Sequence, residues 1–318
     1  MAGELRTGGG HGAVGAPPLG AHWGRQQGAD SGVLWETLRG VVAARAAQTG
    51  RASLDIVDVG GGTGGFAVPL AVLGHSVTVV DPSPDSLAAA QRRAAEAGVP
   101  LRAVQGDVSD LAAATGGAGA DLVLCHSVLE YVDSPGAAMA AIAGILRPGG
   151  VVSVLAASAV AAVIHRVLAG RFDEARRLIA ATGMQTVSPG DAVLPGSDAG
   201  AGGQSAAGAG DRSAIDAGGR SAAGAGGQSA ADAGDRSAAA QEVLPRRFTL
   251  PAVVELIEKA GLRPGPGHGV RVFTDLVPSM FTDTDPGAAD ALLALEETAS
   301  GHPEFRGMAT QFHVLGFR

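Results

Sequence analysis

Short apolar runs alternate with amphipathic segments through the first half of the chain. The apolar runs, which predict buried strands, are residues 55–59, 76–80, 101–105, 121–126 and 151–155. The segments with apolar residues at three- and four-residue steps, which predict helices, are residues 33–46, 66–73, 85–97 and 136–146. Strands and helices that alternate in this way predict a parallel sheet with helices on both faces.

The pattern breaks after this alternation and then resumes near the end of the chain. Between residues 202 and 241 an octapeptide of small and polar residues repeats five times, with Ile215 as its only bulky apolar residue. Such a unit has little apolar surface to bury, so burial cannot offset the conformational entropy lost on folding. We therefore expect a flexible insertion, with a stacked β-solenoid as the alternative. The later pattern predicts a helix at 250–260, a strand at 270–276, a helix at 287–298 and a final strand at 311–318.

These breaks predict the domain organisation. We expect a disordered arm at residues 1–27, a folded core at 28–185, a low-complexity insertion at 186–245 and a return to the same domain at 246–318. The apolar stretch at 151–164 is too short to cross a bilayer and predicts a buried strand that runs into a helix. We expect no membrane span and a cytoplasmic protein.

Composition narrows the class of partner and the chemistry. The formal net charge of -8 argues against a surface covered with phosphate-binding residues, although a local basic groove is compatible with it. Cys125 is the single cysteine, so no internal disulfide forms, and its apolar surroundings predict a buried thiol. The scattered histidines and the lone cysteine provide no set of residues at metal-ligand spacing.

A glycine-rich loop between the first predicted strand and helix is the main chemical signal. Asp58 precedes Gly60, Gly61 and Gly62, and glycines let the backbone turn sharply and approach a ligand closely. Asp81 closes the second strand, where a carboxylate can accept both hydroxyls of a ribose. Asp58 can also serve to orient the loop. The loop also fits the glycine pattern of dinucleotide oxidoreductases, so the glycines alone leave that reading open.

Two further motifs resemble the large class of Rossmann-like methyltransferases. Gly106, Asp107 and Val108 follow the third strand, where that class carries its adenine-binding acid, and residues 146–150 (LRPGG) form a turn before the fifth. A helix N-cap is the alternative role of Asp107. The resemblance implies S-adenosylmethionine as cofactor and a Rossmann-like α/β fold: a mainly parallel seven-stranded sheet with an antiparallel final strand and helices on both faces.

Four short segments resemble a narrower family, the bacterial tRNA 5-carboxymethoxyuridine methyltransferases. They are residues 126–132 (HSVLEYV), 167–173 (VLAGRFD), 269–275 (GVRVFTD), and 292–298 together with 312–314 (FHV). The resemblance implies methylation of the carboxylate of a modified wobble uridine in tRNA to its methyl ester. It also implies that Arg271 lies near the substrate and that the cofactor site is lined by Gly60, Gly61, Asp81, Gly106 and His126.

The chain departs from this family at two places. Asp30 stands where the family has an arginine that contacts the cofactor, and a lysine-rich segment is reduced to Arg246 and Arg247. A small-molecule O- or N-methyltransferase and a non-catalytic cofactor-binding protein are therefore the alternatives. A carboxylate acceptor is already ionised at neutral pH and needs no general base, so Arg271 would orient it while Glu130 and Tyr131 shape the pocket.

His126 has three readings. It is a neighbour of the cofactor, a general base for a phenol or amine acceptor, or a strand-end histidine satisfied by the backbone.

Overall fold

A computed structural model describes residues 32–117, 119–181 and 245–318. The predicted arm at 1–27, Asp30 and the octapeptide repeats lie outside the described residues. None of the helices in the described part of the chain is long and apolar enough to span a bilayer.

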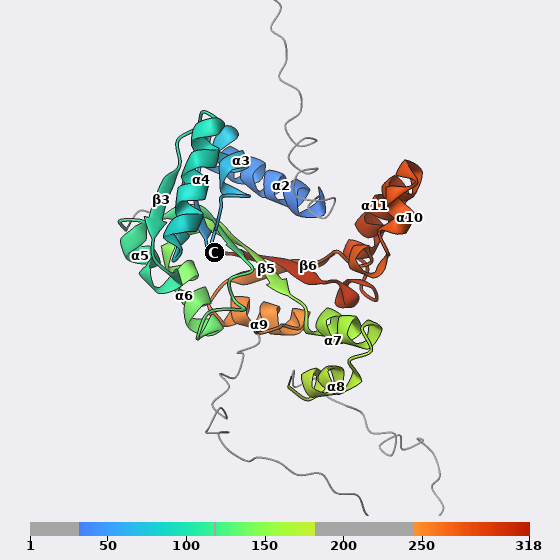
Figure 1. The fold of residues 1–318 in the computed structure, drawn as a ribbon. Helices are drawn as coiled ribbons and strands as arrows, with labels where there is room; N and C mark the ends of the chain where they lie inside the picture. Colours follow the sequence, from blue (N-terminus) through green and yellow to red (C-terminus); the bar gives the residue numbers. More distant parts are fainter. Residues whose placement is uncertain (1–31, 118, 182–244) are drawn as a thin grey trace, which may run out of the picture. The chain divides into compact units, whose positions relative to one another are not determined.

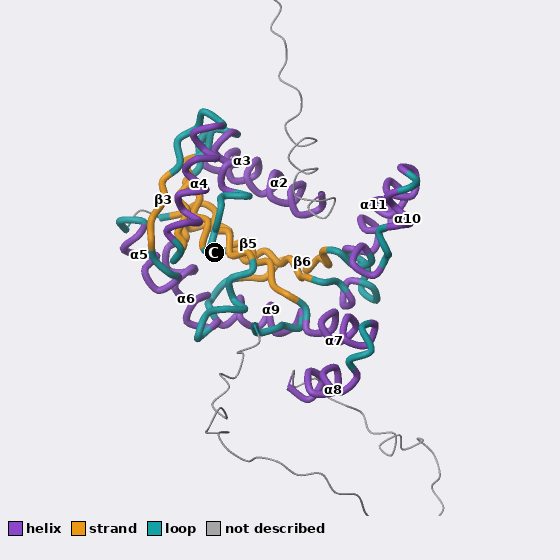
Figure 2. The backbone as a smooth tube through the Cα atoms, viewed as in Figure 1, coloured by secondary structure: helices purple, strands orange, loops and turns teal. Residues whose placement is uncertain are grey.

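Seven strands form one mixed sheet in the order β3-β2-β1-β4-β5-β7-β6. The parallel strands are β1 (Asp55–Val59), β2 (Ser76–Asp81), β3 (Arg102–Gln105), β4 (Ala120–His126) and β5 (Leu146–Ala157). β7 (Gln311–Phe317) pairs antiparallel with β5 and with β6 (Arg263–Val270). The predicted mainly parallel sheet with an antiparallel final strand is confirmed. Figures 1 and 2 show the sheet at the centre of the fold, with helices around it.

Helices cover both faces of the sheet (Figure 1). One face carries α2 (Gly32–Thr49), α3 (Ala67–Val72) and α4 (Pro84–Glu96); the other carries α5 (Leu111–Ala114), α6 (Pro135–Ile145) and α9 (Leu250–Lys259). The remaining helices are α7 (Ala159–Leu168), α8 (Phe172–Ala181), α10 (Met280–Asp283) and α11 (Pro286–Ser300), with 3-10 turns η2 (Val108–Asp110), η4 (Thr274–Leu276) and η5 (Arg306–Met308). The helices predicted from apolar spacing are confirmed to within a few residues.

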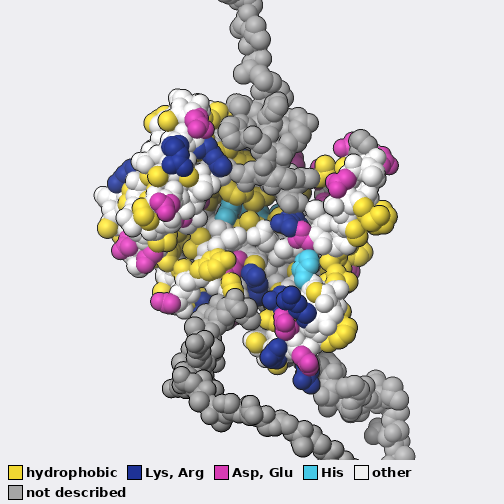
Figure 3. All heavy atoms as spheres, viewed as in Figure 1, with side chains coloured by type: hydrophobic (Ala, Val, Ile, Leu, Met, Phe, Trp, Pro, Cys, Tyr) yellow, Lys and Arg dark blue, Asp and Glu magenta, His cyan; other side chains and the backbone are white. Residues whose placement is uncertain are grey.

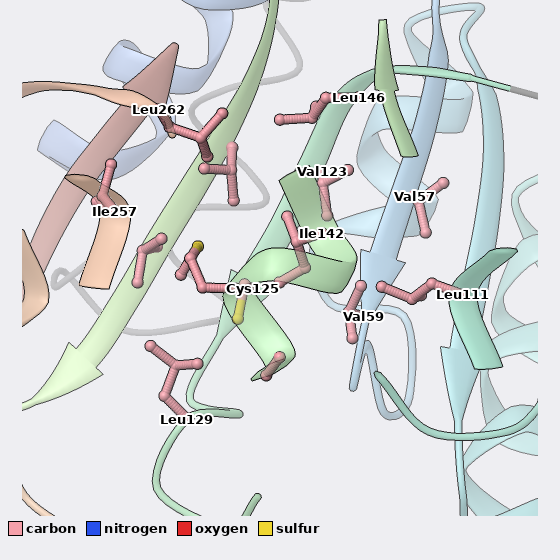
Figure 4. Close-up of a cluster of buried hydrophobic side chains, with 14 of the residues drawn as sticks. Val57, Val59, Leu111, Val123, Cys125, Leu129, Ile142, Leu146, Ile257 and Leu262 are labelled. Atoms are coloured by element: carbon pink, nitrogen blue, oxygen red, sulfur yellow. The ribbon is translucent and has the colours of Figure 1, made fainter. Parts of the chain in front are cut away.

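The strand period of two divides the core into two clusters. In β4, Leu122 and Leu124 pack toward α2, whereas Val123 and Cys125 pack toward α6 and α9. Figure 4 shows Cys125 surrounded by apolar side chains, and this burial raises the pKa of its thiol. The predicted buried thiol is therefore confirmed, and this side chain is inert.

Hydroxyl caps begin the helices near the carboxyl edge of the sheet. The side chain of Ser83 accepts a hydrogen bond at the start of α4, and Ser134, Ser158 and Thr249 do the same for α6, α7 and α9. Each satisfies a backbone N–H that has no partner within its helix. These caps fix where each loop at the site edge ends.

The predicted strand at 270–276 is wrong. The observed strand β6 spans Arg263–Val270, and the chain leaves it at Arg271, whose φ is +62°. The carboxylate of Glu296 then accepts the backbone N–H groups of Val272, Phe273 and Thr274, which draws this segment into a turn. β6 contains two prolines and three glycines, which disfavour a strand, but it lies at the edge of the sheet, where a missing N–H is tolerated.

A buried carboxylate ties the amino ends of the strands together. Asp121, at the start of β4, is fully buried and accepts hydrogen bonds from the backbone N–H of Asp55 at 3.0 Å and from Arg147 at 2.9 Å. Arg45 of α2 and Arg51 also pair with it. Burial by itself would raise the pKa of Asp121, but these bonds and arginines lower it. The cluster lies at the opposite edge of the sheet from the glycine loop, so its role is structural.

Replacing Asp121 by Asn should lower the free energy of unfolding by about 3–5 kcal/mol, because it leaves the buried guanidinium of Arg45 without its carboxylate partner. The measurement is denaturant unfolding, with Asp290→Asn on the exposed side of α11 as the matched control. An Asp121→Asn protein as stable as the control would show that the ion cluster contributes nothing to the fold.

Candidate functional site

The glycine loop lies where the strand order reverses, between β1 and its neighbours β2 and β4. Gly60 has φ +62° and donates its N–H to the carbonyl of Val80 at 2.7 Å. A Cβ at Gly60 would lie 2.5 Å from Val128, and one at Gly61 would lie 2.6 Å from the carboxylate of Asp58. Only glycine fits at these two positions, so the loop exposes bare backbone at the switch point of the sheet.

Asp81 is held in a fixed orientation at the end of β2. Its two carboxylate oxygens accept the backbone N–H groups of Gly62 and Ser83, each at 2.9 Å. The side chain is 8% exposed, and each oxygen keeps a further lone pair. Asp81 can therefore accept a pair of ligand hydroxyls without moving.

The first cavity, which we call the Asp81 cavity, has a volume of about 740 Å³. Its polar side contains Gly60, Asp81, Gly106 and Asp107. Its apolar side is formed by Val108, Val128, Val132, Ala137, Ala138 and Ala141. A polar side with a fixed carboxylate facing an apolar wall suits a nucleoside, with the ribose on Asp81 and the base against the aliphatic side chains.

Asp107 lines this cavity but also caps η2. Its carboxylate accepts the backbone N–H of Ser109 at 2.6 Å, and the carboxylate of Asp110 accepts the backbone N–H of Asp107. The hydrogen bonds from Ser109 hold the pKa of Asp107 below its usual range. The N-cap alternative is thus observed, and Asp107 keeps a charged, exposed carboxylate at the cavity rim.

The second cavity, the His126 cavity, has a volume of about 320 Å³. It is lined by Asp58, Gly60, Gly61, Phe66 and His126, among others. Burial, followed by repulsion from Asp81, raises the pKa of Asp58 to about 7. A cation in this cavity would favour the ionised form of Asp58.

His126 lies at the end of β4, and its ring meets the ring of Phe66 edge-on at 4.7 Å. Burial lowers the pKa of His126 to about 3, so the imidazole is neutral at pH 7. The predicted cofactor residues are thus divided between two cavities: His126 and Asp58 line one, Asp81 and Gly106 line the other, and Gly60 lines both.

The third cavity, the arginine cavity, has a volume of about 420 Å³. It is lined by the arginine residues Arg166, Arg247 and Arg271, by His165, and by Glu130 and Tyr131. Figure 3 shows Lys and Arg side chains gathered beside the hollow at the centre of this face. Arg271 also forms an ion pair with Asp275, which in turn accepts a hydrogen bond from Thr310 at 2.6 Å. A concentration of guanidinium groups suits an anionic ligand.

Glu130 belongs to the wall of the arginine cavity. Its side chain is buried and accepts the backbone N–H of Ala157 at 2.6 Å, which fixes the loop after β4 against the end of β5. Burial raises the pKa of Glu130, while the Ala157 bond and nearby Arg247 oppose this. Tyr131, by contrast, is 72% exposed and lines both the Asp81 and arginine cavities.

Ser127 is a site residue that the sequence pattern did not indicate. It lines all three cavities and has φ +56°, a conformation that is uncommon for a residue with a Cβ. Gln311 of β7 donates a hydrogen bond to its hydroxyl at 3.1 Å. His165 and Arg166 of α7 were also missed. They line the cavity because of how α7 packs against the loops, and the apolar run at 151–164 predicts only a strand and a helix there.

The residues present fit S-adenosylmethionine. The Asp81 cavity matches an adenosine, and the buried pair Asp58 and Asp81 provides negative potential for a cofactor with a sulfonium and an ammonium group. Bare backbone at Gly60 and Gly61 allows the connecting part of the molecule to pass between the two cavities.

Comparisons with known proteins agree with this geometry. Residues 57–154 match the family described as a methyltransferase domain. The chain is 31% identical over 159 residues to the tRNA 5-carboxymethoxyuridine methyltransferase of Escherichia coli strain K12. This match covers 49% of this chain and 59% of that protein. It is 40% identical over 99 residues to a ubiquinone biosynthesis O-methyltransferase of Methylobacterium nodulans, covering 31% and 39%.

Among solved structures, the magnesium protoporphyrin IX methyltransferase of Synechocystis PCC 6803 is similar with a TM-score of 0.46 and 13% identity, covering 89% of this chain and 82% of that one. The chain spans 59% of the length of the Escherichia coli protein and 39% of the Methylobacterium nodulans protein. Residues 57–154 therefore match the model of a methyltransferase domain, and the cofactor that suits this match and the two cavities is S-adenosylmethionine.

Proposed function

We propose that this protein is an S-adenosylmethionine-dependent methyltransferase that converts a carboxylate to its methyl ester. The observation that carries the proposal is the arginine cavity, which meets the other two cavities at Ser127. An anionic acceptor held by Arg247 and Arg271 would lie beside the His126 cavity. Arginine presents a planar fork that matches the two oxygens of a carboxylate.

S-adenosylmethionine, when bound, supplies a methyl group activated by the sulfonium. The tasks left to the protein are alignment and the exclusion of water. Arg247 and Arg271 would orient the acceptor, while Asp58, Asp81 and the glycine loop would hold the donor. Neutral His126, with a pKa near 3, is a poor proton acceptor, and a carboxylate requires none at pH 7.

The substrate that we propose is 5-carboxymethoxyuridine in tRNA. Support comes from the similarity to the Escherichia coli enzyme of that name and from the basic residues at the arginine cavity. Arg246 and Arg247, in place of the lysine-rich segment of the related family, keep positive charge beside this cavity. This substrate implies a cytoplasmic enzyme.

A small-molecule O-methyltransferase is the second candidate, because the chain also resembles ubiquinone biosynthesis O-methyltransferases. A phenolic acceptor must lose a proton during the reaction, so this candidate requires a base near Ser127. The low pKa of His126 favours the carboxylate acceptor over the phenol.

We also propose that residues 28–185 and 246–318 form one methyltransferase domain that the repeats interrupt. β7, from the second segment, pairs with β5 of the first along seven residues, which supports this division.

Replacing Asp81 by Ala should weaken binding of S-adenosylmethionine by about 1–3 kcal/mol, because charged hydrogen bonds to the ribose are lost. Titration calorimetry measures this, with Asp85→Ala at the exposed start of α4 as the control. Equal affinities of the two variants would mean that the ribose binds elsewhere.

The affinity for S-adenosylmethionine should fall about tenfold from pH 8 to pH 6 through Asp58. Because the pKa of Asp58 is about 7 in the free protein, a proton must leave on binding of a cation, and below pH 7 that release opposes binding. The Asp58→Asn variant isolates this contribution, since the amine of the cofactor titrates equally in both proteins. A wild type that follows the same pH curve as Asp58→Asn would contradict the assignment.

The proposed reaction is tested with purified protein, S-adenosylmethionine and tRNA that carries 5-carboxymethoxyuridine. Mass spectrometry of the digested nucleosides should reveal the methyl ester, and Arg247→Gln should raise the KM for tRNA about tenfold by removing a charged contact of about 1.4 kcal/mol. Arg92→Gln, on the exposed side of α4, should leave it unchanged. Methylation of a catechol acceptor without any tRNA ester would favour the second candidate.

A further inference from the structure

Three histidines occupy one register row across the sheet. His126 of β4 pairs with Leu155 of β5, Leu155 pairs with His313 of β7, and His313 pairs with His268 of β6. The rings of His126 and His313 are 6.4 Å apart, and the ring of His268 stacks on that of His313 at 6.2 Å. The proposed reaction uses none of these imidazoles as a base, and His126 alone of the three lines one of the cavities described above, so the row requires an explanation.

Ser153 of β5 bridges two of the rings. Its hydroxyl oxygen lies 2.8 Å from Nε2 of His126 and 2.9 Å from Nε2 of His313, and Ser153 itself is fully buried. Burial lowers the pKa of His126 and of His313 to about 3, so each ring is neutral at pH 7 and carries one N–H. Nδ1 of each ring is buried and has no hydrogen-bond partner in the described part of the chain.

The proton count limits how this bridge can be arranged. A serine hydroxyl donates one hydrogen bond. Both short contacts are hydrogen bonds, with the hydroxyl proton used, when Ser153 donates to Nε2 of one histidine and accepts from Nε2 of the other. The histidine that accepts must then carry its own proton on Nδ1. If that were His313, an N–H would be buried between strands without an acceptor, which is rarer and costlier than an unpaired lone pair. His126, in contrast, lines a cavity that can hold a ligand, although its Nδ1 is as buried as that of His313, so donation to a ligand requires a movement of the ring or of its neighbours.

We propose that Ser153 and His313 are positioning residues that hold His126 in the tautomer protonated on Nδ1, so that His126 donates a hydrogen bond to an oxygen of the molecule in the His126 cavity. Asp58 lines the same cavity and suits an ammonium group. The N–H of His126 suits a carboxylate and the carboxylate of Asp58 suits an ammonium group, so together they would recognise the zwitterionic end of an amino acid. Naming this as the methionine end of the cofactor rests on the proposed function, whereas the tautomer does not.

The tautomer can be read directly in the ligand-free protein. Long-range proton–nitrogen correlation spectra of the ¹⁵N-labelled full chain at pH 7 distinguish the two neutral forms, and loss of signals in His126→Gln and in His313→Gln assigns the rings. The expected result is His126 protonated on Nδ1 and His313 protonated on Nε2. The opposite assignment, or His126 protonated on Nε2, overturns the proposal.

Variants then separate positioning from a merely structural role. Ser153→Ala should shift His126 toward the Nε2-protonated form and weaken binding of S-adenosylhomocysteine about tenfold, measured by calorimetry. His313→Gln keeps an amide that can donate to Ser153, so it should retain the wild-type tautomer of His126 and bind within about twofold of the wild type. Ser279→Ala, at an exposed position before α10, is the matched control.

If Ser153→Ala leaves both the tautomer and the affinity unchanged, Ser153 and His313 do not position His126. Should the protein bind no S-adenosylhomocysteine at all, the proposed function fails, while the spectra of the ligand-free protein still decide the arrangement of the bridge.

Discussion

The close approach of the glycine loop to its neighbours is the constraint on which the site depends. At Gly60 and Gly61 the backbone lies so near Val128 and Asp58 that a Cβ would collide with them. This contact lets the loop end directly over the switch point of the sheet. It also leaves room on either side for the Asp81 and His126 cavities. A side chain at either position would push the loop away and close the passage between the cavities.

Charge is distributed unevenly around this loop. Asp58 and Asp81 are buried beside the His126 and Asp81 cavities, while Arg166, Arg247 and Arg271 line the arginine cavity. The two groups of charges meet across Ser127, whose left-handed backbone turns the chain away from β4 at this point. A cationic donor and an anionic acceptor would each find a matching environment on opposite sides of one residue. Such local charge would let a protein with a net charge of -8 accept the proposed anionic substrate.

The framework behind the site is rigid for reasons that are distinct from its chemistry. Asp121 and its arginines hold the amino ends of the strands, and hydroxyl caps fix the helices at the carboxyl ends. The loops between them are short and carry most of the polar residues of the site. The hydrogen bonds of Ser153 to His126 and His313 link β4, β5 and β7 beside the His126 cavity.

The sequence by itself determined the parallel core, because apolar runs and helical spacing are local properties that burial imposes on each element. It also placed the glycine loop after the first strand and Asp81 at the end of the second, since both positions are marked by local sequence. It misplaced β6, because the pairing with β7 and the carboxylate of Glu296 override the local preferences of residues 263–276. Ser127, Arg166 and the row of histidines emerged only from the tertiary structure. Their arrangement depends on which strands and helices lie side by side, and contacts between residues 27 and 160 positions apart leave no periodic signal in the chain.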